Sequence, residues 1–138
     1  MLKQSKELTI MTQSIIDSFD RKDIQQDLSD AHNCILNNLP TPAVMLLQKS
    51  AEGLLKEFYK NKMGEYPPSE FKSTWGNMVK TLKPILENEK DPILHLLSYR
   101  KFERNTASHP GSRYTSSEAI EIFYRVKELM IELAKKIV

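Results

Sequence analysis

Hydrophobic residues recur three or four positions apart along most of the chain, which is the period of an α-helix. Polar residues fill the positions between them, so each periodic stretch has one apolar face and one hydrated face. The predicted helices cover about residues 6–19, 24–39, 42–64, 71–82, 92–109 and 116–137. Prolines and short polar stretches separate these segments, as expected where helices begin and end.

Local chemistry predicts several of the helix ends. Thr41-Pro42 places a hydroxyl at an N-cap and a proline at the first helical position, where the missing N–H costs nothing. Thr115 and Glu118 form a capping box, in which each side chain accepts a hydrogen bond from the other residue's backbone N–H. Gly64 is expected to end the third helix, and Pro110-Gly111 the fifth.

The last predicted helix carries a regular apolar stripe. Its members alternate four and three residues apart: Ala119, Phe123, Val126, Met130, Leu133 and Ile137. An average spacing of about 3.5 residues suits packing inside a helical bundle or across a seam between two copies of the chain. The pattern favours neither of these two positions for the stripe.

Composition agrees with the helical pattern. The chain has 138 residues, of which 40% are hydrophobic and 28% charged, and only four are glycine. A strand-rich fold of this size needs many tight turns, which four glycines cannot supply. We therefore predict an all-α bundle of five or six helices, with residues 1–138 forming a single domain.

The compartment is predicted from features that the sequence lacks. Cys34 is the one cysteine, which excludes an internal disulfide and fits a reducing environment. The longest apolar runs are far shorter than the roughly 20 residues that span a bilayer. The polar N-terminus does not resemble a signal peptide. We expect a cytoplasmic protein without a membrane partner.

Most residue patterns typical of catalytic or ligand-binding sites are absent from the sequence. There is no glycine-rich phosphate loop. His32 and Cys34 are two positions apart, so on a helix they point in nearly opposite directions and do not make a zinc pair. We expect neither a metal nor a cofactor.

A local basic patch stands out in a chain whose net charge is only +2. From Arg100 to Arg113 there are four basic residues and one acidic residue, a local net charge of +3. Arg104, Asn105, Ser108 and His109 place a guanidinium, an amide, a hydroxyl and an imidazole within six positions. Cations, an amide and a hydroxyl are suited to holding phosphate.

Pro110 determines whether the side chains of Arg104 and His109 can face each other. In a continuous helix, residues five apart differ by about 140° and diverge. Proline disfavours the α conformation for the residue before it, so His109 should leave the helix, and its ring can turn back toward Arg104. Arginine holds a phosphate with two parallel hydrogen bonds, and histidine moves a proton near neutral pH. The blander alternative is that Arg104 pairs with an acid and His109 caps a helix end.

The string Arg104-Asn105-x-x-x-His109-Pro110-Gly111, followed by a capped amphipathic helix, resembles the Arg-x4-6-His motif of the HEPN superfamily. Residues 39–43 (Leu-Pro-Thr-Pro-Ala) and 49–55 (Lys-Ser-Ala-Glu-Gly-Leu-Leu) look like a helix of its DUF4145-like branch. The similar stretches together cover about residues 28–135.

The resemblance implies an antiparallel helical bundle that forms a homodimer, with two motifs meeting across the interface. It implies a metal-independent endoribonuclease that cleaves RNA by attack of the 2′-OH, in a toxin or antiviral defence setting. A separate antitoxin or sensor protein is then an expected partner. Arg104, Asn105 and His109 are the catalytic positions that the resemblance carries over.

Other residues receive supporting roles with simpler alternatives. Arg100, Lys101, Ser108 and Arg113 are candidate RNA or phosphate contacts. Glu52 either orients Arg104 or is a solvated acid beside neighbouring lysines. The chain as a whole could instead be a non-catalytic module that binds RNA, a nucleotide or a protein partner, or a purely structural dimerisation domain. Trp75 and Tyr99 could stack on bases, although tryptophan in an apolar stripe more often belongs to the core.

Overall fold

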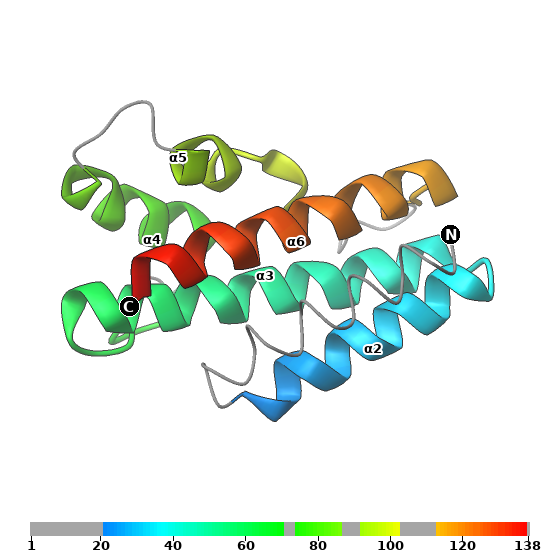
Figure 1. The fold of residues 1–138 in the computed structure, drawn as a ribbon, viewed down its shortest axis with the longest axis horizontal. Helices are drawn as coiled ribbons and strands as arrows, with labels where there is room; N and C mark the ends of the chain where they lie inside the picture. Colours follow the sequence, from blue (N-terminus) through cyan, green and yellow to red (C-terminus); the bar gives the residue numbers. More distant parts are fainter. Residues whose placement is uncertain (1–20, 71–73, 87–91, 103–112, 138) are drawn as a thin grey trace.

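A computed structural model gives the fold (Figure 1) and describes residues 21–70, 74–86, 92–102 and 113–137. In this part of the chain all regular secondary structure is helical, and five α-helices pack together, which confirms the all-α class. The elements are α2 (Lys22–Leu36), α3 (Pro40–Met63), α4 (Trp75–Leu82), η1 (Lys83–Ile85), α5 (Pro92–Leu97), η2 (Arg100–Phe102) and α6 (Ser116–Ile137), where η marks a 3-10 helix. The helix predicted over 6–19 lies outside the described residues.

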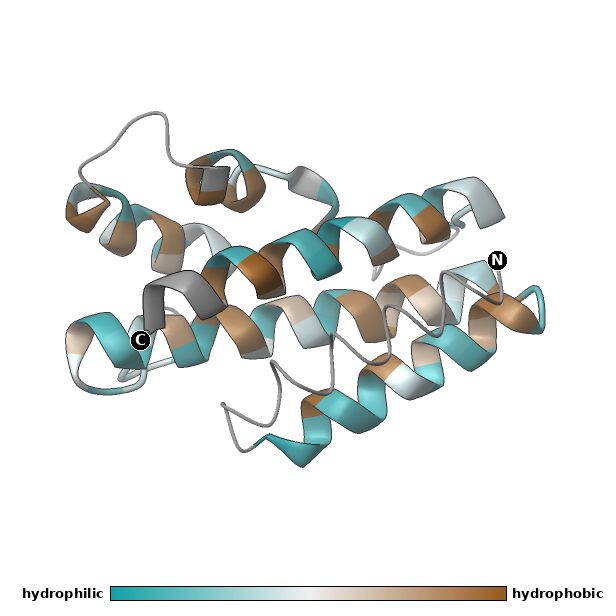
Figure 2. Cartoon of the chain, viewed as in Figure 1, coloured by the Kyte–Doolittle hydropathy of each residue, from teal (hydrophilic) through white to brown (hydrophobic). Residues whose placement is uncertain are grey.

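The central element is α3, which packs against α2, α6, α4 and η2. Hydrophobic and polar segments alternate along its length and along the helices around it (Figure 2), as expected for helices that each bury one face. α2 and α3 approach closely at Gly53, where an added Cβ would lie 3.1 Å from the side chain of Ile24. None of the described helices combines the length and the apolarity needed to cross a membrane.

The predicted antiparallel arrangement holds for α2 and α3 but not for α3 and α6 (Figure 1). α6 begins beside the start of α3. The hydroxyl of Ser116, the first residue of α6, donates to Asn38 Oδ1 at 2.9 Å. The backbone N–H of Tyr114 donates to Thr41 Oγ1 at 3.0 Å. The chain between α3 and α6, which includes α4 and α5, returns to the end where α3 began. α6 therefore runs in the same direction as α3.

The turn between α2 and α3 lies earlier in the chain than predicted. α2 ends at Leu36, and Asn38 adopts the left-handed conformation with φ of 57°. α3 begins at Pro40 with Leu39 in the N-cap position, so the predicted N-cap role of Thr41 is wrong. The other end of α3 confirms the prediction: Gly64 has φ of 87°, and its N–H bonds to the Lys60 carbonyl at 2.8 Å.

The helix predicted to run from Pro92 toward His109 ends at Leu97 instead. Leu97 and Phe102 are 2% and 1% exposed. Residues five apart on a helix point about 140° away from each other, so a continuous α-helix cannot bury both side chains against one core. The Ser98 hydroxyl bonds back to the Leu94 carbonyl at 2.9 Å, and the chain then forms the 3-10 turn η2.

The start of α6 confirms the capping box. The N–H of Glu118 donates to Thr115 Oγ1 at 3.1 Å, and the N–H of Thr115 donates to Glu118 Oε1 at 3.1 Å. The described members of the predicted stripe lie in the core of the chain, with Phe123 half-buried at its edge. The stripe is therefore an internal packing face, and the alternative of an exposed seam is wrong for these residues. Two further buried positions, Ile122 and Leu129, were not in the predicted stripe.

Candidate functional site

Arg104, Asn105, Ser108 and His109 all lie outside the described residues. The structure describes the two flanks of the 103–112 segment that contains them, up to Phe102 and again from Arg113. The candidate site is therefore built from these flanks and from the helices that hold them.

The upstream flank ends on a buried aromatic anchor. Phe102 packs against Trp75 with ring centroids 5.3 Å apart, and against Tyr99 in an edge-on contact at 4.9 Å. Trp75 Nε1 donates to the Leu97 carbonyl at 3.0 Å, which satisfies its one polar atom. Trp75 thus belongs to the core, as its simpler alternative predicted, and the chain enters the 103–112 segment from a fixed point.

The downstream flank is held at the start of α3. Thr41 Oγ1 accepts the Tyr114 N–H, and the capping box of Thr115 follows immediately. Arg113 is exposed to solvent just before this anchor, in a position where its side chain is accessible to an anion.

Gln48 of α3 links the two flanks. This side chain is fully buried, and its Nε2 donates to the Lys101 carbonyl at 2.8 Å. The same Nε2 lies 3.5 Å from the Tyr114 hydroxyl. Sequence reasoning missed Gln48, although a signal was present: it lies four residues after Val44, in phase with the apolar stripe of α3. A polar residue at such a position needs a buried hydrogen-bond partner.

Lys101 is less available for phosphate than the local charge count indicated. Its Nζ lies 3.6 Å from Glu121 Oε2 and 3.9 Å from Glu118 Oε2. Two carboxylates near one ammonium compensate its charge, so an approaching phosphate must compete with them. Of the predicted phosphate contacts whose side chains are described, Arg113 is the more accessible cation. Arg100 lies in η2.

Tyr99, which lies between α5 and η2, contacts two charged side chains of α6. Its hydroxyl donates to Glu121 Oε1 at 2.7 Å, and the guanidinium of Arg125 lies 5.6 Å from its ring centroid. Burial raises the pKa of Tyr99 above its usual value, and the bond to Glu121 raises it further. The same hydrogen bond, together with the charge of Lys101, lowers the pKa of Glu121. The Tyr99 hydroxyl is therefore bonded to Glu121, and its ring packs against Phe102.

Glu52 forms an ion pair with Lys56 of its own helix at 3.2 Å. This contact agrees with the neighbouring lysine of the simpler predicted role, but the Glu52 side chain is only 22% exposed, so it is not the solvated acid of that role. The alternative role needs a contact with Arg104, which lies outside the described residues.

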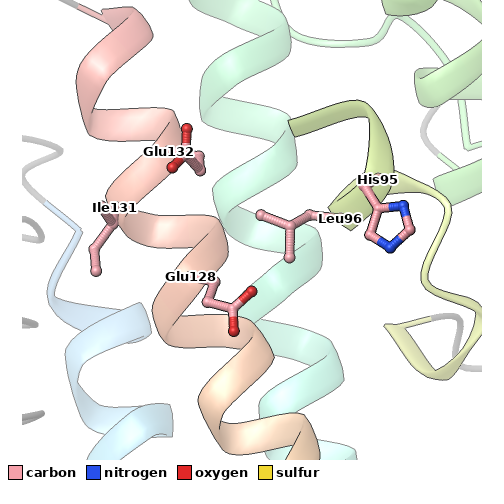
Figure 3. A pocket seen from close by; sticks show the side chains of 5 residues that line it. All are labelled: His95, Leu96, Glu128, Ile131 and Glu132. Carbon is pink, nitrogen blue, oxygen red and sulfur yellow. The ribbon is translucent and has the colours of Figure 1, made fainter. Parts of the chain in front are cut away.

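A separate pocket of about 350 Å³ lies between α5 and α6 (Figure 3). It is lined by His95, Leu96, Glu128, Ile131 and Glu132. Glu128 is thirteen residues after Thr115, which places it about 20 Å along α6 from the downstream flank. Its lining residues include none of the described residues that the sequence predicted for the site.

Metal-ligating side chains are scattered over the described residues. In that part of the chain, no group of three or more histidine, cysteine, aspartate or glutamate side chains could hold a metal ion. His32 stacks on Phe123 with centroids 6.1 Å apart, which gives it a packing role between α2 and α6. Cys34 is a free, partly buried thiol.

Comparison with known proteins finds no family model, no curated protein and no solved structure that matches this chain. The features that bear on function are the Arg104–His109 string and the helices that hold its flanks.

Proposed function

We propose that the chain is a metal-independent endoribonuclease of the HEPN type. The observation that carries the proposal is the string Arg104-Asn105-x-x-x-His109-Pro110-Gly111 in front of a capped helix. The described structure supports it in two ways: the chain is all-α, and both flanks of the string are held against α3. Reactions that depend on tenths of an ångström need such fixed supports.

The chemistry follows from the residue types. His109 takes the proton of a ribose 2′-OH, and the 2′-oxygen attacks the neighbouring phosphorus. The bond from phosphorus to the 5′-oxygen breaks, which leaves a 2′,3′-cyclic phosphate and a 5′-OH end once that oxygen has received a proton. Arg104 and Asn105 hold the non-bridging oxygens, on which negative charge accumulates in the transition state.

We propose that the active unit is a homodimer. The reaction needs a base and an acid, and the motif contains one histidine, so a second copy would supply the second imidazole. The described stripe of α6 is buried within the chain, so the seam must use another surface. Leu36 and Leu39 are 44% and 50% exposed beside the α2–α3 turn, next to the start of α6, and offer apolar area at that end.

RNA is the proposed substrate, with Arg113 as the main accessible contact among the described residues. The setting we propose is that of a toxin or an antiviral effector in the cytoplasm. A separate antitoxin or sensor protein would then control the activity, as the resemblance implies.

The proposal is tested with pure protein and total cellular RNA in EDTA, which removes free divalent metal. We expect cleavage by the wild type and none by His109→Ala. Arg104→Lys keeps the charge but loses the planar fork that binds two oxygens, so its rate should fall at least tenfold. His95→Ala is the matched control, because His95 is exposed on α5 and lies in the separate pocket.

Equal rates for the wild type and His109→Ala would contradict the proposal. Binding of RNA without any cleavage would instead support the alternative of a non-catalytic module.

A further inference from the structure

We propose that Gln48 is a positioning residue that sets the distance between the two ends of the 103–112 segment. The inference rests on the proposed function for its catalytic consequence, but its structural basis is independent of that function. It consists of contacts among described residues: Gln48, the Lys101 carbonyl and the Tyr114 hydroxyl.

The burial of Gln48 calls for a reason. Its side chain has no exposed area, and its neighbours along the same face of α3 include Val44, Leu47 and Ala51, which are equally buried. An amide removed from water is costly unless its hydrogen bonds are made inside the protein. A leucine or methionine would fill the same space without that cost, so packing alone does not explain a glutamine here.

Both atoms near Gln48 Nε2 belong to the flanks of one segment. Lys101 is 53 residues away in the chain and Tyr114 is 66 residues away. Twelve residues separate Lys101 from Tyr114, and such a stretch could extend to about 40 Å. Instead, the Lys101 carbonyl and the Tyr114 hydroxyl both lie within 3.5 Å of one nitrogen atom.

Tyr114 is held at two points along α3. Its backbone N–H bonds to Thr41, and its hydroxyl lies near Gln48, seven residues or about 10 Å further along the helix. The tyrosine side chain therefore lies along α3 from one anchor toward the other. Gln48 is the point where this downstream anchor meets the upstream one, and so it couples their positions.

The coupling matters because Arg104 follows the Lys101 carbonyl by only three residues. A shift of about 1 Å in a catalytic group can cost about a hundredfold in rate. Gln48 itself does not contact RNA in this account. Its loss should therefore lower kcat and leave KM within about twofold of the wild type.

The test compares three variants. Gln48→Met keeps the volume and removes both N–H donors, while Tyr114→Phe removes only the hydroxyl and keeps the ring. Ser50→Ala is the control, because Ser50 is also fully buried on α3 but donates to the Leu46 carbonyl of its own helix. Tyr114→Phe keeps the inference testable if Gln48→Met does not fold.

Two readouts are measured. One is kcat and KM on an oligoribonucleotide that carries the mapped cleavage site. The other is hydrogen exchange of peptides covering 103–113, which does not depend on catalysis. We expect Gln48→Met to lower kcat at least tenfold and to speed exchange at least threefold, Tyr114→Phe to do both more weakly, and Ser50→Ala to change neither.

Wild-type kcat and wild-type exchange in both Gln48→Met and Tyr114→Phe would overturn the inference while leaving the proposed function intact. If the wild type cleaves no RNA, the proposed function fails and exchange alone decides the inference. Faster exchange in Gln48→Met then supports the positioning role, and unchanged exchange overturns it.

Discussion

Phe102 should be among the most costly residues to truncate, because it fixes the chain directly before the motif segment. Its side chain is 1% exposed and touches the rings of Trp75 and Tyr99. A phenylalanine buries about 150–250 Å², which at about 25 cal/mol per Å² is worth roughly 4–6 kcal/mol. Alanine retains part of that area and leaves a cavity, so Phe102→Ala should lower the free energy of unfolding by about 3–5 kcal/mol.

The assay is urea denaturation at 25 °C, followed by circular dichroism of the helices. Met63→Ala is the control, because Met63 is 42% exposed at the far end of α3 and its truncation should change the free energy of unfolding by less than about 0.5 kcal/mol. A loss below about 1 kcal/mol for Phe102→Ala would refute the reasoning. It would mean that Phe102 is not packed between Trp75 and Tyr99, and that the upstream flank of the motif is not anchored.

Three further predictions concern a cap, a carboxylate and a lysine. Thr115→Ala should lower the free energy of unfolding by about 1 kcal/mol in the same urea assay, because it removes the N-cap of α6, and no loss would contradict the cap. The hydrogen bond from Arg21 lowers the pKa of Asp23 from 3.8 to about 2, so this pair should stabilise the fold above about pH 4 and cease to do so as the pH falls through 2. Because Asp23 is exposed, the contribution should be below about 1 kcal/mol. In urea denaturation, the free energy of unfolding should change less between pH 6 and pH 2.5 for Asp23→Asn than for the wild type. An equal change in both proteins would contradict the lowered pKa of Asp23. Lys101 is already paired with two carboxylates. In filter-binding titrations, Lys101→Gln should therefore reduce the salt dependence of RNA affinity less than Arg113→Gln does. The opposite order would show that Lys101 is the main phosphate contact.

The long helices could be predicted because their signals are local. The apolar period located α2, α3 and α6, and the ends at Gly64 and Thr115 followed from backbone chemistry within a few residues. The end of α5 could not be predicted in this way. It depends on burying both Leu97 and Phe102 against a core made of distant residues.

The candidate site likewise has a part that local sequence predicts and a part that depends on contacts between distant residues. The string from Arg104 to His109 is visible in the sequence because its residue types and spacing are unusual. Local chemistry predicts an N-cap at Thr41, but in the structure the Thr41 hydroxyl accepts the N–H of Tyr114, 73 residues away. Gln48 and the glutamates around Lys101 are likewise tertiary partners, and no local pattern pairs them.

The central claim is that His109 and Arg104 cleave RNA through the 2′-OH without metal. The most direct measurement is end-group analysis of the fragments that pure protein makes from total cellular RNA in EDTA. The account predicts 2′,3′-cyclic phosphate and 5′-OH ends with the wild type and with His95→Ala, and uncut RNA with His109→Ala. Fragments that end in a 3′-OH, or equal cleavage by His109→Ala, would contradict it.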